Sequence, residues 1–202
     1  VSGKEISYNN INDMDIAIEL ALEFNSQSCV IVKHGNPCGV SVSEKQKNAY
    51  KKALKCNPVS AFGGIVAFNN KLELSTAKLI KNIFTEIVIA PKITKEAKSC
   101  LSKRKNLILI EHKSKKKQDS LHFKSTRNLL LIQEYNNKSV SRKDLKFVTK
   151  KKPSLKTIED LLFAFTVCKY VNSNAVVVAN NKSVTGIGVG QTNRIDATKH
   201  AI

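Results

Sequence analysis

The chain has 202 residues, of which 42% are apolar and 6% aromatic, and it carries 34 Lys and Arg against 16 Asp and Glu. A chain of this length buries roughly 70% of its unfolded surface and has enough apolar residues for one core, which excludes wholesale disorder. It has no apolar run near the ~20 residues of a membrane helix and no signal-peptide pattern at its start. We therefore expect a cytoplasmic protein with no membrane partner.

The first half of the sequence alternates helical spacing, which begins after Asp13 as the expected N-cap, with short β-branched runs. We expect helices at 13–24, 43–56, 75–84 and 94–103, and strands at 29–32, 65–68, 86–90 and 106–110. The stretch 33–39 is expected to be an irregular loop, because glycine and proline interrupt it. This alternation favours an α/β domain with a largely parallel sheet.

The second half is less regular and shows no internal repeat. We expect an exposed lysine-rich loop at 112–120, followed by extended stretches at 129–133 and 146–149. A mostly buried helix is expected at 157–170. After it we expect strands at 175–179 and 184–189 around a turn at 180–181, and then the start of another helix. The run at 150–153 is the one plausible boundary. It divides the chain into sub-domains at 1–150 and 151–202.

The net charge of +18 raises the alternative of a basic module that binds nucleic acid or another anionic partner. Only four of the basic residues are Arg, although base reading and bidentate phosphate contacts favour its planar fork. Lysines are spread over the expected helix exteriors, and aromatic platforms for single strands are missing. We predict no nucleic-acid partner, and the alternative depends on the lysine run at 113–117.

Five cysteines are scattered without a C-x-x-C pair, which argues against a disulfide framework or a zinc ribbon. His34 and Cys38 superficially resemble part of a deaminase zinc site, but the acid of H-x-E and the second thiol are missing. We therefore predict no zinc and no other metal site.

Lys33 and His34 directly follow the strand at 29–32. Ligands of open α/β sheets bind at the carboxyl ends of strands. A neutral imidazole accepts a proton near pH 7, and an ammonium stabilises developing negative charge. The two residues alone favour a plainer interpretation, a solvent-exposed lysine and a histidine that hydrogen-bonds its own loop.

Three glycines alternate at 186–190, but the third comes one residue too early for the dinucleotide-binding motif. They indicate either a strand on which another backbone packs closely or a backbone that a ligand approaches. Arg194, just beyond, is suited to a carboxylate or phosphate. The loop at 60–64 could also lie close to a ligand.

Six motifs, in order and at compatible spacing, resemble those of one family. They are Gly3-Lys4-Glu5-Ile6-Ser7-Tyr8-Asn9-Asn10, Val30-Ile31-Val32-Lys33-His34-Gly35-Asn36-Pro37-Cys38-Gly39, Ser60-Ala61-Phe62-Gly63-Gly64, Ile89-Ala90-Pro91, Ser173-Asn174-Ala175 and Gly186-Ile187-Gly188-Val189-Gly190-Gln191. The family is the bifunctional purine biosynthesis protein, in which phosphoribosylaminoimidazolecarboxamide formyltransferase (AICAR transformylase) is joined to IMP cyclohydrolase. The resemblance is to the transformylase half and covers nearly the whole chain.

The resemblance implies formyl transfer from 10-formyltetrahydrofolate to the 5-amino group of 5-aminoimidazole-4-carboxamide ribonucleotide, a step of IMP biosynthesis. It also implies a cytidine-deaminase-like three-layer fold without zinc, and a homodimer with its sites at the interface. Resemblance to some members of the family suggests a monovalent cation as well, which the sequence neither requires nor excludes.

The resemblance also assigns roles to single residues. His34 matches the proton acceptor, and Lys33 matches the residue that stabilises the transition state. Asn174 matches a substrate-binding asparagine whose amide can orient the carboxamide. The remaining matches are Gly63 and Glu86 for the nucleotide substrate, and Arg194 and Ile195 for the folate.

The chain also departs from the family. The cyclohydrolase domain, an arginine-tyrosine substrate motif expected before Val1 and a closing folate segment expected beyond Ile202 are absent from the sequence. The stretch 125–129 lacks a pair of glycines expected there. We expect an interior fragment, incomplete at both ends, that does not complete the reaction alone.

Overall fold

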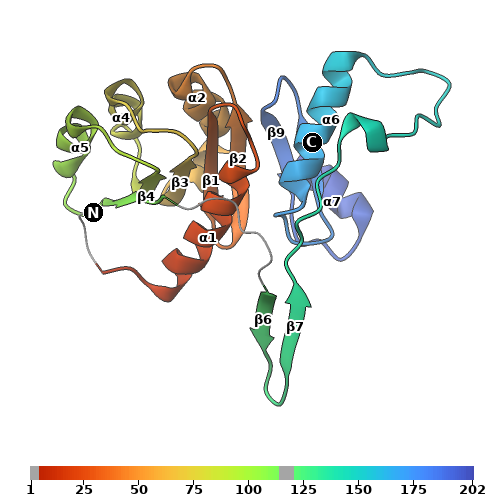
Figure 1. Ribbon diagram of the computed structural model, residues 1–202, viewed down its shortest axis with the longest axis horizontal. Coiled ribbons are helices and arrows are strands. Elements are labelled where there is room, and N and C mark those ends of the chain that lie inside the picture. Colours follow the sequence, from red (N-terminus) through yellow and green to blue (C-terminus); the bar gives the residue numbers. More distant parts are fainter. Residues whose placement is uncertain (1–4, 114–120) are drawn as a thin grey trace.

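The computed structural model describes residues 5–113 and 121–202 and contains a five-stranded sheet with the order β2-β1-β3-β4-β5 (Figure 1). The strands are β1 (Ser28–Lys33), β2 (Asn36–Val42), β3 (Gly64–Phe68), β4 (Thr85–Ala90) and β5 (Ile108–Glu111). The α/β class is confirmed, as are the strands expected at 29–32, 65–68, 86–90 and 106–110.

The sheet is mixed, so the prediction of a largely parallel sheet is wrong. Strands β3, β4 and β5 are parallel, whereas β1 is antiparallel to both β2 and β3. The error arises at 33–39, where most of the expected irregular loop belongs to β2. Pro37 pairs with Val32 at a register shift of the ladder, and a Cβ on Gly39 would come within 2.1 Å of the Ala53 carbonyl oxygen. Proline and glycine therefore occupy strand positions that suit them.

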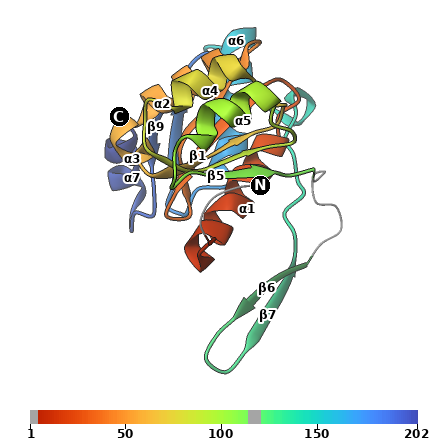
Figure 2. The same ribbon diagram turned by 90° about the vertical axis from the view of Figure 1, so that its left-hand side faces the viewer.

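Helices cover both faces of this sheet. The helices α2 (Gln46–Cys56), α4 (Leu74–Ile80) and α5 (Lys95–Ser102) lie on one face, and α1 (Tyr8–Leu22) lies on the other (Figure 2). Side chains alternate along β1, so that Cys29 and Ile31 join the core under α2, α4 and α5, while Val30 and Val32 join the core under α1. Phe163 of α6 (Leu155–Cys168) belongs to this second core. The result is a three-layer arrangement.

Helix α1 begins earlier than the sequence pattern indicates. The Ser7 hydroxyl accepts the Asn10 backbone N–H, and the Asn10 side chain in turn accepts the Ser7 N–H, which completes a capping box. Asp13 therefore lies within the helix, and the prediction that it is the N-cap is wrong. Its carboxylate is directed instead at the turn between β1 and β2.

The end of the chain has the same order of elements as its beginning. Helix α6, strands β8 (Val176–Ala179) and β9 (Val184–Gly188), and helix α7 (Arg194–Ala201) follow one another as α1, β1, β2 and α2 do. The antiparallel β8–β9 hairpin turns at Asn181 and Lys182, one residue later than expected. The Val42 N–H donates to the Lys182 carbonyl at 2.9 Å and joins this hairpin to β2.

The glycines of β9 serve close packing of backbone on backbone. A Cβ on Gly186 would come within 2.0 Å of the Ala201 carbonyl oxygen, and one on Gly188 within 1.8 Å of the Ala197 carbonyl oxygen. Helix α7 thus lies directly against the strand. At these two positions the packing interpretation of the motif is confirmed.

Two apolar surfaces lie outside the cores. The composition of helix α6 predicted that it is mostly buried, and this prediction is wrong. Leu161 and Phe165 are 56% and 62% exposed beside an apolar hollow of about 1090 Å³. The strand expected at 129–133 is confirmed as β7 (Leu130–Glu134), which pairs with β6 (Leu121–Ser125) in a hairpin that projects from the body (Figure 1). The stretch 146–149 forms no strand.

The remaining elements are the short helix α3 (Pro58–Ala61) and the 3₁₀ turn η1 (Arg142–Asp144). Residues 114–120, with most of the lysine run at 113–117, lie outside the described residues. Within the described ranges no helix is long and apolar enough to cross a membrane.

We expect Gly188→Ala to destabilise the protein by about 1–3 kcal/mol, because the added methyl group must push α7 away from β9. Urea unfolding measures the change. Lys199→Ala, on the exposed side of α7, is the control and should alter stability by less than about 0.5 kcal/mol. Equal losses in the two variants would contradict the packing role of Gly188.

Candidate functional site

Lys33 and His34 lie at the carboxyl end of β1, where the chain reverses into β2. Lys33 pairs with Asn36, so His34 and Gly35 form a two-residue hairpin turn. Both turn residues have positive φ, at 53° for His34 and 73° for Gly35. A left-handed conformation is routine for glycine but uncommon for histidine. The turn leaves the His34 side chain exposed and Lys33 half-buried.

The carboxylate of Asp13 holds this turn from helix α1. One oxygen accepts the His34 backbone N–H at 3.0 Å, and the other accepts the Gly35 N–H at 2.6 Å. Asp13 is 9% exposed, so both bonds are shielded from water. No sequence pattern indicated this contact, because Asp13 matched the pattern of a helix cap.

The Lys33 ammonium connects the turn to the loop at 60–64. It donates to the Phe62 carbonyl at 2.7 Å, and the N–H of neighbouring Gly63 donates to the Phe84 carbonyl at 2.8 Å. Gly63 has φ 73°, and Glu86 follows two residues after Phe84 on β4, half-buried. Lys33, Gly63 and Glu86 thus lie at one end of the sheet.

This end of the sheet differs from the carboxyl edge of a parallel sheet, at which every strand would end. It is the carboxyl end of β1 but the amino end of β3 and β4, because β1 runs antiparallel to β3. The expectation that Lys33 and His34 lie at the carboxyl end of a buried strand is confirmed, but the neighbouring ends of β3 and β4 are amino ends because the sheet is mixed.

Asn36 joins the turn to the segment that carries Asn174. Its amide nitrogen donates to the His34 carbonyl at 3.2 Å, and its amide oxygen accepts the Asn172 N–H at 3.2 Å. The Asn174 side chain donates to the Gln191 carbonyl at 2.9 Å. Asn36 is within the motif that carries Lys33 and His34, yet sequence reasoning did not single it out.

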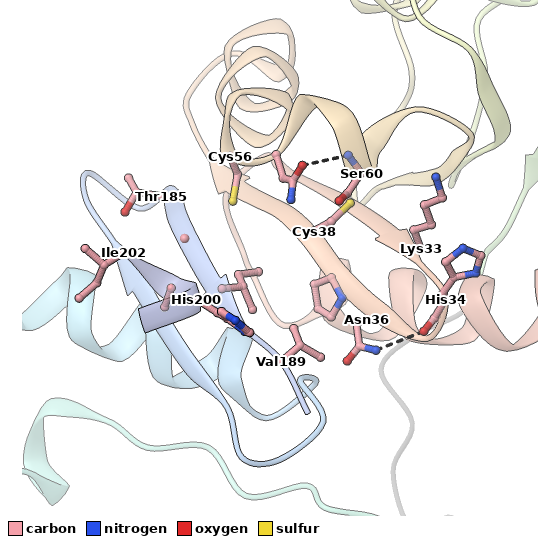
Figure 3. Close-up of a pocket in the computed structure, with 15 residues that line it drawn as sticks. Lys33, His34, Asn36, Cys38, Cys56, Ser60, Thr185, Val189, His200 and Ile202 are labelled. Carbon is pink, nitrogen blue, oxygen red and sulfur yellow. Dashed lines mark hydrogen bonds between the residues drawn. The ribbon is translucent and has the colours of Figure 1, made fainter. Parts of the chain in front are cut away.

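A pocket of about 450 Å³ opens beside the turn, between β2, α2 and α3 on one side and β9 and α7 on the other (Figure 3). Its lining includes Lys33, His34, Asn36, Cys38, Cys56 and Ser60 from the first wall, and Thr185, Gly186, Val189 and His200 from the second. His200 and Thr185 were not expected here from the sequence. The pocket is polar at its Lys33 and His34 end.

The pocket brings together some of the candidate residues. Lys33 and His34 line it, whereas Gly63 and Asn174 do not. Gly63 follows Phe62, which binds Lys33, and Asn174 lies two residues after Asn172, which binds Asn36. Its lining among the described residues does not include Glu86, Arg194 or Ile195. The last two are exposed on the first turn of α7, at the opposite end of that helix from His200.

Two thiols in the pocket wall are held in the protonated form. Burial raises the pKa of Cys38 to about 12, with a further rise from neighbouring Cys56, and burial raises the pKa of Cys56 to about 11. Within residues 5–113 and 121–202 no three His, Cys, Asp or Glu side chains gather so that they could hold a metal ion. That the protein binds no zinc stays a prediction.

A mixed α/β sheet with a lysine and a histidine at the mouth of a pocket is typical of a domain with a small-molecule site. The model of the AICARFT/IMPCHase bienzyme family matches residues 1–202, and the chain belongs to this family.

Curated relatives carry the name bifunctional purine biosynthesis protein PurH. The chain is 50% identical to that of Buchnera aphidicola subsp. Schizaphis graminum over 203 residues, 49% to that of Caldicellulosiruptor bescii over 201, and 48% to that of Fusobacterium nucleatum over 202. These alignments cover 99–100% of the chain but 39–40% of each relative. The chain therefore spans about two fifths of their length.

We expect Cys38 and Cys56 to alkylate slowly at pH 8, where roughly 10⁻⁴ and 10⁻³ of these thiols are thiolate. Their rates should rise about tenfold per pH unit up to pH 10, as peptide mass spectrometry after iodoacetamide measures. The same peptides in 8 M urea serve as the control and should react at ordinary thiol rates. A plateau below pH 10 in the folded protein would contradict the raised pKa values.

Proposed function

We propose that this region carries the formyl-transfer half-reaction of its family, in which a formyl group passes from 10-formyltetrahydrofolate to the 5-amino group of 5-aminoimidazole-4-carboxamide ribonucleotide. The observation that carries the proposal is the pairing of Lys33 with His34 at one pocket mouth, in a chain whose family includes this activity in its name. The parent protein would also act as an IMP cyclohydrolase through a region outside this chain.

The two residues have complementary roles in this reaction. The 5-amino group is a poor nucleophile because its lone pair is delocalised into the ring, so removal of a proton as it attacks lowers the barrier. The exposed His34 imidazole is suited to accept that proton. Negative charge develops on the formyl oxygen, and the Lys33 ammonium has two further N–H donors beside the one bound to Phe62 to stabilise it.

The remaining residues are proposed to bind the two substrates. Asn174 would orient the carboxamide, and Gly63 and Glu86 would contact the nucleotide. Arg194 and Ile195, exposed side by side on α7, suit a molecule with a flat ring system and a carboxylate tail, so they would hold the folate, which supplies the formyl group. The fold class is proposed as cytidine-deaminase-like, with sub-domains at 1–150 and 151–202; the repeated order of helix, two strands and helix supports this division.

We also propose that the protein acts as a homodimer with sites at its interface. One face of the β6–β7 hairpin supports this, because the ladder places Phe123 opposite Ile132, and both are more than half exposed. Leu121 and Leu130 lie on the same face and are similarly exposed. A contiguous apolar face of this kind is typical of a surface that another chain covers.

The function is tested with His34→Asn in the full-length protein, because asparagine tolerates the left-handed conformation of the turn while it removes the base. We expect kcat for formyl transfer to fall by about 10²–10⁴-fold. Lys33→Met should lower it through the loss of charge, and Lys47→Met, on the exposed side of α2, is the matched control. Near-normal turnover of His34→Asn would refute the role of His34.

The dimer is tested with the double variant Phe123→Asp and Ile132→Asp in the full-length protein. We expect sedimentation velocity to show a shift from dimer to monomer, because the two charges would be buried at the interface. Lys124→Asp with Gln133→Asp, on the opposite face of the same hairpin, is the control and should leave the dimer intact. A dimer in both double variants would exclude this face as the interface.

A further inference from the structure

The turn that presents His34 has a conformation that histidine rarely adopts. Two consecutive residues with positive φ make a hairpin turn of the type that favours Asn-Gly, and here the first position is histidine. Contacts from outside the turn are therefore of interest, because they can fix a conformation that histidine adopts less readily than asparagine or glycine.

Asp13 supplies such a contact, and its carboxylate binds backbone N–H groups of the turn. Successive N–H groups in a left-handed turn converge on a concave site that suits an anion, and the Asp13 carboxylate occupies it with one oxygen on each N–H. On the other side of the turn, the Asn36 amide donates to the His34 carbonyl. The backbone of His34 is held at both its N–H and its carbonyl, while its imidazole is exposed.

The same device occurs a second time, away from the pocket. Asp160 of α6 accepts the Asn181 N–H at 2.9 Å and the Lys182 N–H at 2.7 Å, and both of these turn residues have φ 52°. Neither Asn181 nor Lys182 lines the pocket. The two aspartates thus make the same hydrogen bonds to two hairpin turns, one with a candidate catalytic side chain and one without.

We propose that Asp13 is a positioning residue for proton transfer, and this inference rests on the function proposed above. By fixing the left-handed turn, its carboxylate aims the His34 imidazole at the reacting amine. Misplacement of a catalytic group by about 1 Å costs on the order of 10²-fold in rate. A turn freed from Asp13 loses both hydrogen bonds to the carboxylate, so the backbone of His34 would no longer be held on its N–H side.

The sharpest variant is Asp13→Asn, which keeps the shape of the side chain but leaves one acceptor oxygen for two donors. Its NH₂ group would face a backbone N–H, so one of the two bonds must break. Asp160→Asn is the matched control, since it breaks the same kind of bond at the second turn.

Both variants are made in the full-length protein, and kcat is expressed per folded molecule. We expect Asp13→Asn to lower kcat about 10²-fold with KM for the nucleotide within about threefold of normal. Asp160→Asn should keep kcat within about twofold, even if it lowers the unfolding temperature as much. Equal effects of the two variants on kcat, or a normal kcat in Asp13→Asn, would overturn the proposal.

Hydrogen exchange followed by mass spectrometry gives a readout that does not depend on formyl transfer. Peptides that span 33–36 should exchange at least about tenfold faster in Asp13→Asn and unchanged in Asp160→Asn. Unchanged exchange at 33–36 would show that Asp13 does not hold the turn. If the unmodified enzyme transfers no formyl group while the two variants show this exchange pattern, the proposed function is refuted and the hold of Asp13 on the turn stands. If Asp13→Asn does not fold, Asp13→Ser, with one small acceptor, is judged by the same criteria.

Discussion

Strand β1 is antiparallel to both of its neighbours, and the position of the site depends on this pairing. Because β1 ends where β3 and β4 begin, Lys33 comes within hydrogen-bond reach of the loop at 60–64. A parallel β1 would have carried Lys33 to the opposite edge of the sheet. The pairing with β2 adds the tight turn that exposes His34. The positions of both candidate catalytic side chains therefore depend on the direction of β1.

The helical layers on either side give this strand its fixed surroundings. Helix α1 directs Asp13 toward the end of β1 from one face. The short helix α3 is followed by Phe62, whose carbonyl oxygen accepts a hydrogen bond from the Lys33 ammonium. Tyr170 and Lys169 both contact the Glu23 carboxylate, which ties the end of α6 to the end of α1. The site is thus framed by contacts between segments far apart in the sequence.

Much of the fold could be predicted from the sequence, because apolar spacing reports burial on one face of a helix or strand. Strands β1, β3, β4 and β5 and the helices between them follow from that signal, as does the position of Lys33 and His34 after a buried strand. The direction of β2 could not be predicted in this way. Pro37 and Gly39 are typical of loops, and only the contact of Gly39 with α2 shows why they stand in a strand.

The candidate site was accessible to sequence reasoning only in part. Adjacent catalytic residue types and the ordered motifs indicated Lys33 and His34, whereas Asp13 and His200 reach the turn and the pocket through tertiary contacts that leave no local pattern. The exposure of Leu161 and Phe165 was likewise not predictable. An apolar helix has the same composition whether other elements pack on one of its faces or on all of them.

The absence of side chains on Gly186 and Gly188 has a mechanical consequence for the far wall of the pocket. Helix α7 packs so closely on β9 that neither can move toward the other without overlap of backbone atoms. Its eight residues extend over about 12 Å, with Arg194 and Ile195 at the first turn and His200 at the last. One helix thus carries exposed candidate residues at one end and a residue of the pocket wall at the other, at a spacing that its backbone contact with β9 sets.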